Sequence, residues 1–406
     1  MVVGLFGVKV GNIGMQDAGC RMQDTGCRMQ DAGYWIGKID LHLVSCISYL
    51  CSMQYRIIDD TFQLYNLMLG DIAQAKEYIL LETYKFANDH MGERFRDALT
   101  KKAKEGVSVK ILIDSWGKGP ISENFFSELI SHHGEVKFFE KIKISSDLFT
   151  RGNRRDHRKI LVIDDAISYL GSANITGYNL NWRELSLRTE GDLALAMKKV
   201  FMETYEAFNP YIISNKLAFT RTIFHGDFEI IRDVPSLPLQ RIRKKYVQMI
   251  RYAKKSLVIE TPYFLPGYNL RKALIDASKR KVEVKIIMPR NSDVKMIDIL
   301  RNKYLGLLHK HNVQIYFYGP YNLHAKMLMI DDSLFSISSA NFDYRSFRFQ
   351  YEIALIGYEK SIVEQLQTHV TETLASSELF NYETWEKRSW IEKFFEWLLT
   401  PFRHLL

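Results

Sequence analysis

Two short stretches of this chain carry the same chemically active residues at the same spacing. The first reads His157-Arg158-Lys159, then Asp164, then Gly171-Ser172-Ala173-Asn174, and the second reads His324-Ala325-Lys326, then Asp331, then Ser338-Ser339-Ala340-Asn341. The two histidines lie 324 − 157 = 167 positions apart, and every internal spacing is kept. One His-x-Lys could arise by chance, but two copies with the same later Asp, Ser and Asn indicate an internal duplication.

Each copy combines groups that are suited to a phosphate. An imidazole can attack phosphorus or carry a proton near neutral pH. A lysine supplies fixed positive charge, while Ser and Asn supply hydrogen-bond donors for phosphoryl oxygens whose charge changes during reaction. The catalytic candidates are therefore His157, Lys159, His324 and Lys326, and the candidates for phosphate binding or support are Ser172, Asn174, Ser339 and Asn341.

One copy alone lacks a second acid or base, so the chemistry requires both. Two histidines on opposite sides of one phosphorus would fit in-line displacement. In this hypothesis one histidine forms a phosphohistidine, and the other protonates the leaving alcohol and then deprotonates the incoming acceptor.

The motif aspartates are expected to act differently from the histidines. The apolar run at residues 160–163 predicts a buried strand, on which side chains alternate between faces. His157 and Lys159 then share one face, and Asp164 lies on the other. We count Asp164 and Asp331 with the catalytic motif, but we expect both to bind backbone or basic groups near the strand end.

Two glutamates are candidates to orient the imidazoles. Glu184 and Glu352 lie ten and eleven residues after the motif asparagines. The alternative for Glu184 is a solvated position on a strand.

The duplicated pattern resembles the phospholipase D superfamily, whose mark is a repeated HxKx4Dx6GSxN motif. The stretch Phe342-Asp343-Tyr344-Arg345-Ser346 resembles bacterial cardiolipin synthases more narrowly. This resemblance covers about residues 55 to 406 and implies an acid near positions 184 and 352, with His157 as nucleophile and His324 as acid and base. The sequence departs from the pattern once, because Ser338 stands where Gly is usual, and we expect slightly changed packing with retained function.

The segments before each motif alternate between strand and helix patterns. Strands are predicted near 79–84, 107–114 and 136–139, with helices at 93–104 and 123–131; the second half repeats this order with strands at 257–261, 282–288 and 313–318, and helices at 269–278 and 293–308. Such alternation indicates an α/β fold. Together with the resemblance, it predicts two similar phospholipase D-like α/β sandwich halves, each a mixed sheet flanked by helices, with the active site at their pseudo-twofold interface.

The predicted domains follow from these patterns. Residues 53–209 and 239–380 are the two halves, 210–238 a connector, and 381–406 an amphipathic segment. Residues 1–52 contain a glycine-bearing seven-residue repeat, Met15 to Arg21 and onwards, and are predicted to be a low-complexity, disordered leader. All four cysteines fall in this leader, which fits a folded region from a reducing compartment.

The C-terminal segment predicts contact with a membrane. Trp385, Trp390 and Trp397 occur there with several basic residues, as in a helix that lies in the membrane interface. The alternative is a helix packed on the core. The apolar run at 41–53 is too short and too polar to span a bilayer. We expect peripheral attachment to the cytoplasmic face of the cell membrane.

Three functions are compatible with these residues. The first is a phosphatidyltransferase that joins two phosphatidylglycerols into cardiolipin and releases glycerol, as the resemblance implies. The second is a phospholipase D that uses water as the acceptor, and the third is a nuclease. The net charge of +8 fits any phosphate-bearing partner, but small superfamily nucleases usually carry one motif per chain, so nucleic acid is the weaker candidate. No metal or other cofactor is expected, because two lysines supply the charge and the sequence has no HExxH.

Overall fold

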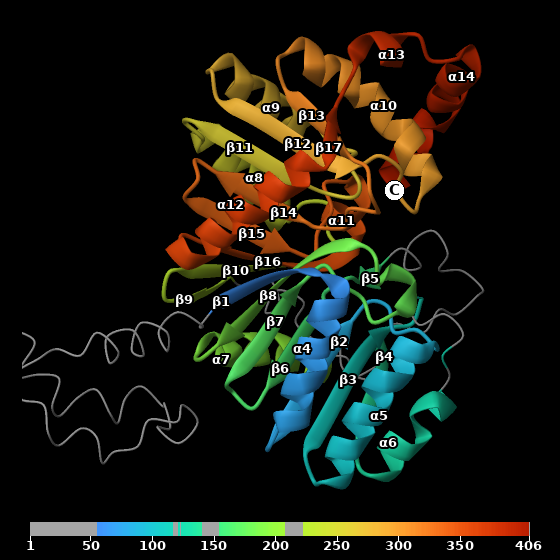
Figure 1. Cartoon of the computed structure of the whole chain (residues 1–406), viewed down its shortest axis with the longest axis vertical. Helices are drawn as coiled ribbons and strands as arrows, with labels where there is room; N and C mark the ends of the chain where they lie inside the picture. Colours follow the sequence, from blue (N-terminus) through green and yellow to red (C-terminus); the bar gives the residue numbers. More distant parts are fainter. Residues whose placement is uncertain (1–54, 117–120, 122, 140–153, 208–221, 406) are drawn as a thin grey trace, which may run out of the picture. The chain divides into compact units, whose positions relative to one another are not determined.

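Two mixed β-sheets organise the computed structural model of this chain, which describes residues 55–116, 121, 123–139, 154–207 and 222–405 (Figure 1). The first sheet has the spatial order β1 (Tyr55–Asp60), β8 (Arg183–Glu190), β7 (Ile167–Gly171), β6 (Ile160–Ile163), β2 (Tyr78–Thr83), β3 (Ser108–Asp114) and β4 (Glu135–Phe139). The second has the order β17 (Ser377–Leu379), β13 (Gln314–Tyr318), β12 (Glu283–Pro289), β11 (Ser256–Glu260), β14 (Met327–Ile330), β15 (Leu334–Ser338), β16 (Gln350–Gly357), β10 (Phe228–Asp233) and β9 (Ile223–His225), and β5 (Arg155–Asp156) pairs with β16. The predicted leader at 1–52 lies outside the described residues.

The two sheets share one topology. The order β1-β8-β7-β6-β2-β3-β4 corresponds to β10-β16-β15-β14-β11-β12-β13. The helices correspond in the same way: α4 (Thr61–Gln74) to α8 (Arg241–Tyr252), α5 (His90–Lys104) to α9 (Tyr268–Lys279), α6 (Ser127–Ser131) to α10 (Lys295–Lys310), and α7 (Leu193–Ala207) to α12 (Lys360–Ala375). Shorter pieces are η3 (Glu123–Phe126), η4 (Gly177–Asn179) and α11 (Tyr344–Phe349). The predicted α/β class with two similar halves is confirmed.

The second half begins earlier than the sequence predicted. Part of the expected connector at 210–238 forms β9 and β10, and β10 pairs antiparallel with β16 along five residues from Glu229 to Asp233. This strand takes the place that β1 has in the first sheet. Residues 208–221 of the predicted connector lie outside the described residues.

Alternating side chains divide each sheet between two cores. In β2, Ile79 and Leu81 face a cluster formed with α4 and α5, while Leu80 joins a cluster that contains residues of both halves, such as Val258 and Met327. Each fully buried aliphatic side chain stabilises the fold by about 1.5–3 kcal/mol. The halves are therefore joined by a continuous apolar core.

Backbone hydrogen bonds join the halves beside each motif. His157 N donates to Tyr351 O at 3.0 Å, and His324 N donates to Arg183 O at 2.8 Å. Strand β5, directly before His157, pairs with β16 of the other half, and Figure 1 shows the two strands adjacent. Each histidine is therefore held by backbone from the opposite half.

The C-terminal segment consists of α13 (Tyr382–Glu386), α14 (Trp390–Leu399) and η6 (Thr400–Leu405). One side docks on the second half, because the Trp385 ring fills the space over Gly306 of α10 and Leu399 packs on the apolar core. The other side leaves Trp390 and Trp397 75% and 71% exposed. The segment thus combines the packed helix and the exposed apolar face that the sequence offered as alternatives. Within the described ranges, no helix has both the length and the apolar character to cross a bilayer.

Candidate active site

Each motif histidine is hydrogen-bonded to a glutamate of the opposite half. Nδ1 of His157 lies 3.1 Å from Glu352 Oε1 and 3.0 Å from the Ser339 carbonyl oxygen. Nδ1 of His324 lies 2.8 Å from Glu184 Oε2. The structure thus brings both predicted glutamates to the imidazoles, and the pairing crosses between the halves.

The motif serines hold these glutamates in place. Ser172 Oγ donates to Glu184 Oε2 at 2.5 Å, and Ser339 Oγ donates to Glu352 Oε2. Both hydroxyls also accept a backbone N–H from the next strand. Of the two roles offered for these serines, phosphate binding or support, these contacts are those of support. Each half contributes a Ser–Glu pair that fixes the ring of the other half's histidine, as an outer shell fixes a ligating residue.

The two lysines lie in one buried electrostatic environment with both histidines. Nζ of Lys159 donates to His157 O at 2.6 Å, and Nζ of Lys326 donates to His324 O at 2.7 Å. Burial lowers the pKa of Lys159 to about 7, with Lys326 adding to the effect and both site glutamates opposing it. Burial likewise lowers the pKa of Lys326 to about 8. Because charges of both halves act on each lysine, the two motifs form a single site.

Burial lowers the pKa of both histidines. It lowers the pKa of His157 well below its ordinary value, and the nearby charges of Lys159 and Lys326 lower it further. Burial also lowers the pKa of His324, although Glu184 opposes this effect. A proton held at Nδ1 by a carboxylate leaves Nε2 with its lone pair. No hydrogen bond from the part of the chain that the structure describes involves either Nε2.

The two glutamates differ in charge. Burial favours protonation of Glu184, but attraction and hydrogen bonding from His324, with help from Lys326, lower its pKa to about 2. Burial raises the pKa of Glu352 to about 7, against the opposing effects of Lys159 and Ser339. His324 therefore has an ionised partner at neutral pH, and His157 has a partner that titrates there.

The motif aspartates lie at the far end of their strands from the histidines. Asp164 accepts the backbone N–H groups of residues 76, 77 and 78, at 2.6, 2.8 and 2.8 Å. Asp331 accepts the equivalent groups of residues 254, 255 and 256, within 2.6 to 3.0 Å. Each carboxylate thus fixes the start of β2 or β11, which agrees with the expected structural role. The structure does not bring these two residues to the reacting groups.

The motif asparagines are not equivalent. Asn174 Oδ1 accepts the backbone N–H of Lys85 at 3.2 Å. Asn341 is 3% exposed, and its Oδ1 has no hydrogen-bond partner among the described residues.

Two aromatic residues at the site were missed by the sequence analysis. The rings of Tyr84 and His157 have centroids 5.1 Å apart, and those of Trp182 and His324 are also 5.1 Å apart. The signal for Tyr84 is its place directly after the strand β2, and the signal for Trp182 is its place two residues before Glu184.

A further pair of glutamates lies behind the site. Glu82 pairs with Arg158 at 3.8 Å. Glu260 pairs with His369 at 2.7 Å, and the other nitrogen of His369 lies 2.7 Å from Asp59. Both glutamates are fully buried. They support the interface of the halves. Within the described ranges, no group of three or more His, Cys, Asp or Glu residues is arranged to hold a metal ion.

Two imidazoles in crossed pairs with glutamates, two lysines and a duplicated α/β fold define a phosphodiester-cleaving enzyme of the phospholipase D type. The sequence matches the family model described as "Cardiolipin synthase, PLD-like domain" over residues 68–209 and 246–374, and the chain belongs to this family.

Similar proteins agree with this assignment. The major cardiolipin synthase ClsA of Bacillus subtilis is 31% identical over 347 residues, which cover 82% of this chain and 72% of that protein. Cardiolipin synthase 1 of Staphylococcus epidermidis is 33% identical over 355 residues, covering 84% and 72%. The crystal structure of phosphatidylserine synthase from Haemophilus influenzae superposes with a TM-score of 0.69 at 14% identity, covering 87% of this chain and 96% of that one, and it shows the shared fold.

Proposed function

We propose that this enzyme is a phosphatidyltransferase that joins two phosphatidylglycerols into cardiolipin and releases glycerol. The observation that carries the proposal is the pair of crossed His–Glu hydrogen bonds, which hold two imidazoles in one buried site. Two relatives support the choice of substrate. Both are cardiolipin synthases by name, and the match to this chain covers 72% of each.

In the first step His157 is the nucleophile. Its Nε2 attacks the phosphorus of one phosphatidylglycerol, so that a P–N bond forms and the P–O bond to the glycerol headgroup breaks. His324 enters this step as the imidazolium, which the ionised Glu184 stabilises against the effect of burial, and it gives its Nε2 proton to the departing glycerol oxygen. Lys159, Lys326 and the two motif asparagines hold the phosphoryl oxygens as negative charge develops.

In the second step His324 is the base. It takes the proton from a glycerol hydroxyl of the second phosphatidylglycerol, whose oxygen then attacks phosphorus. The P–N bond breaks, and neutral His157 is restored. The burial of both rings, 7% and 5% exposed, limits access of water, which would otherwise divert the phosphohistidine to phosphatidic acid.

The exposed side of α14 provides the membrane contact in this proposal. Trp390 and Trp397 would lie at the level of the lipid headgroups while Trp385 keeps the segment docked. Attachment is then peripheral and at the cytoplasmic face. Deleting residues 390–406 would release the enzyme from vesicles, which co-sedimentation measures; unchanged sedimentation would contradict this contact.

The test of the reaction is lipid analysis by mass spectrometry after incubation of the full chain with phosphatidylglycerol vesicles. We expect cardiolipin and glycerol in equal amounts. Phosphatidic acid as the main product would identify water as the acceptor and overturn the transferase proposal in favour of a phospholipase D.

A further inference from the structure

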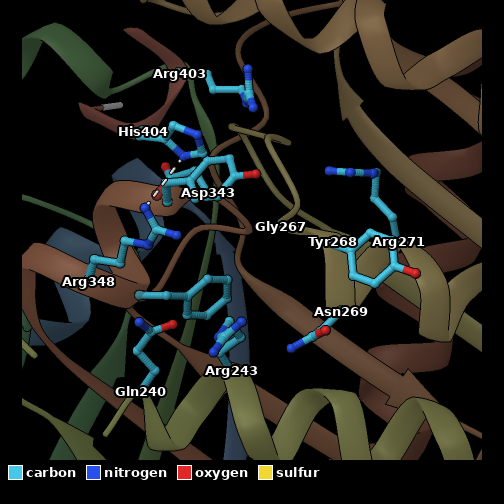
Figure 2. Close-up of a pocket in the computed structure, with 12 residues that line it drawn as sticks. Gln240, Arg243, Gly267, Tyr268, Asn269, Arg271, Asp343, Arg348, Arg403 and His404 are labelled. Carbon is cyan, nitrogen blue, oxygen red and sulfur yellow. Dashed lines mark hydrogen bonds between the residues drawn. The ribbon is translucent and has the colours of Figure 1, made fainter. Parts of the chain in front are cut away.

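A cavity of about 310 Å³ lies in the C-terminal half (Figure 2). It is formed by the first turns of α8 and α9, by α11 and by η6 at the C-terminus. None of the histidines, lysines or glutamates of the candidate active site lines it. Its size is within the range of small-molecule sites, roughly 300–1,000 Å³.

The cavity is strongly basic. Figure 2 shows Arg243, Arg271, Arg348 and Arg403 around it, against one acidic residue, Asp343. The Asp343 carboxylate already accepts the backbone N–H of Ser346 at 2.7 Å.

Among the described residues, none of the hydrogen bonds that these arginines donate goes to a carboxylate. Arg271 and Arg403 donate to carbonyl oxygens at 2.6 and 2.9 Å, and Arg348 donates to His404 Nδ1 at 3.4 Å. Nε of Arg243 is buried without a hydrogen-bond partner in the described part of the chain. Four guanidinium groups with this geometry make a site for an anion, and guanidinium groups suit phosphate in particular.

The beginning of α9 supplies a second, independent feature. Its N-cap is Gly267, which has no side chain to accept the first N–H groups of this 12-residue helix. The equivalent helix of the first half, α5, is capped by Asp89, whose carboxylate accepts the N–H groups of Met91 and Gly92 at 3.1 and 3.0 Å. The first half thus satisfies this helix end with its own carboxylate. In the second half, Gly267 and the two residues after it line the cavity instead, and an open helix N-terminus attracts anions.

The C-terminal segment indicates where such an anion would come from. Arg403 and His404 belong to η6, as does Phe402, which is 54% exposed. This short helix directly follows α14, whose Trp397 is 71% exposed, so the basic cavity is continuous in sequence with exposed apolar side chains. A phospholipid with its phosphate in the cavity can place its acyl chains along that apolar side.

We propose that this cavity binds the phosphodiester headgroup of an anionic phospholipid, at a site separate from the two histidines. The choice of a lipid rests on the proposed lipid-transferase function, whereas the phosphate chemistry rests on the arginines and on the open end of α9. The enzyme then has two phosphate sites: one where the phosphodiester reacts, and one where an anionic lipid holds the enzyme on its membrane.

The test compares two double variants of the full chain. Arg243→Gln with Arg348→Gln removes two cavity charges. Arg251→Gln with Lys279→Gln removes two exposed charges from the last turns of the same two helices, α8 and α9. Binding is measured to vesicles of phosphatidylcholine with and without phosphatidylglycerol, to glycerophosphoglycerol and to inorganic phosphate. The cavity variant should bind phosphatidylglycerol vesicles about thirtyfold more weakly than the control variant. Equal binding of the two variants overturns the proposal, and a difference seen with inorganic phosphate alone assigns the cavity to free phosphate and also overturns it.

A third variant separates binding from folding. Gly267→Asp copies Asp89 and would close the end of α9 with a carboxylate; the added Cβ meets only the Tyr344 ring at 3.6 Å, an ordinary contact. It should raise the unfolding midpoint while weakening vesicle binding, a combination that simple destabilisation cannot produce. Stronger or unchanged binding contradicts the proposal.

Cardiolipin formation by the unmodified chain is measured in parallel. If the unmodified chain makes cardiolipin and both double variants bind vesicles equally, the lipid-binding role of the cavity is refuted and the proposed reaction stands. A clear binding difference without cardiolipin would refute the proposed reaction and leave the anion site standing.

Discussion

The two half-sites carry the same motif but hold different charges. Glu184, the partner of His324, also accepts from Asn179 Nδ2 at 3.1 Å, and its pKa lies at about 2. Glu352, the partner of His157, lies near buried Asp343, and burial raises its pKa to about 7. The two copies of the motif therefore share one geometry but leave their glutamates with different charges: His324 and Lys326 lower the pKa of Glu184, whereas burial prevails at Glu352. This difference suits a division of labour, with an acid and base at His324 and a nucleophile at His157.

The residues behind the half-sites differ in the same way. Glu82 faces Arg158, and burial together with the neighbouring Asp156 raises the pKa of Glu82 well above its ordinary value. The equivalent Glu260 faces His369, whose pKa is raised to about 9 by Glu260 and Asp59 against the effect of its burial. The buried glutamate thus faces an arginine in one half, and in the other it faces a histidine whose pKa is raised.

Replacing either histidine should have the largest effect. His157→Ala and His324→Ala should each lower kcat/KM by about 10⁴ or more, because each removes a group that takes part in bond breaking. The two variants should differ in whether the phosphohistidine intermediate forms. Rapid quench of His324→Ala with alkaline detergent and labelled phosphatidylglycerol should still trap some phosphoenzyme that acid then releases, and His157→Ala should give none. A phosphoenzyme that accumulates in His157→Ala would reverse the assignment of the two roles.

Replacing the glutamates should separate the half-sites. Glu184→Gln removes an anion that is present throughout the neutral range, and we expect a loss of about 10³ in kcat/KM. Glu352→Gln replaces a group that is already partly protonated at neutral pH, so the loss should be nearer tenfold.

The charge of Glu352 also predicts the direction in which kcat/KM changes with pH. Because the pKa of Glu352 is raised to about 7, the group gains a proton as pH falls through that value and His157 loses its anionic partner. The activity of the unmodified enzyme should therefore fall below about pH 7, and Glu352→Gln should flatten that acidic limb of the kcat/KM profile. Equal losses and parallel profiles for the two variants would show that the half-sites do not differ in charge.

His369 should make the stability of the interface depend on pH. Its folded-state pKa is raised from 6.5 to about 9, so the charged form contributes its full stabilisation below about pH 6.5, and this is lost as pH rises through about 9. The contribution is about 3 kcal/mol. Urea unfolding of the unmodified chain should show this loss at alkaline pH, and His369→Gln should remove it. Arg158→Gln is the matched change in the other half. It leaves His369 in place, so this variant should keep the loss of stability between about pH 6.5 and pH 9. A His369→Gln curve parallel to that of the unmodified chain would contradict this account.

Much of the site could be predicted from the sequence because a duplicated motif fixes residue types and local geometry together. The parity of the strand before Asp164 placed its carboxylate away from the histidine. Sequence order could not show that Glu184 reaches His324 and Glu352 reaches His157, since this depends on how two halves pack. The acceptor of Ser172 could not be predicted for the same reason, because it is the glutamate that crosses to the other half. The arginine cavity combines residues from 240 to 404, and no local pattern connects them.

The smallest predicted effect concerns the one departure from the motif pattern. A Cβ on Gly171 would lie 2.3 Å from Ser186 Oγ and 2.5 Å from the Leu185 carbonyl oxygen, so this position has no room for a side chain. Gly171 pairs with Ser186 in the sheet, whereas its counterpart Ser338 pairs with Ala354. The smaller neighbour gives Ser338 its space, and the Ser338 hydroxyl binds the backbone of residue 340.

Ser338→Gly should therefore cost less than about 1 kcal/mol and change kcat/KM by no more than about twofold. Gly171→Ser should cost about 3 kcal/mol, because one of the clashing atoms is a backbone oxygen that cannot rotate away. Urea unfolding of both variants, with turnover measured on the same samples, tests this contrast. A large loss of activity in Ser338→Gly without loss of stability would mean that the hydroxyl takes part in the reaction, and the second half-site would then differ from the first in chemistry as well as in charge.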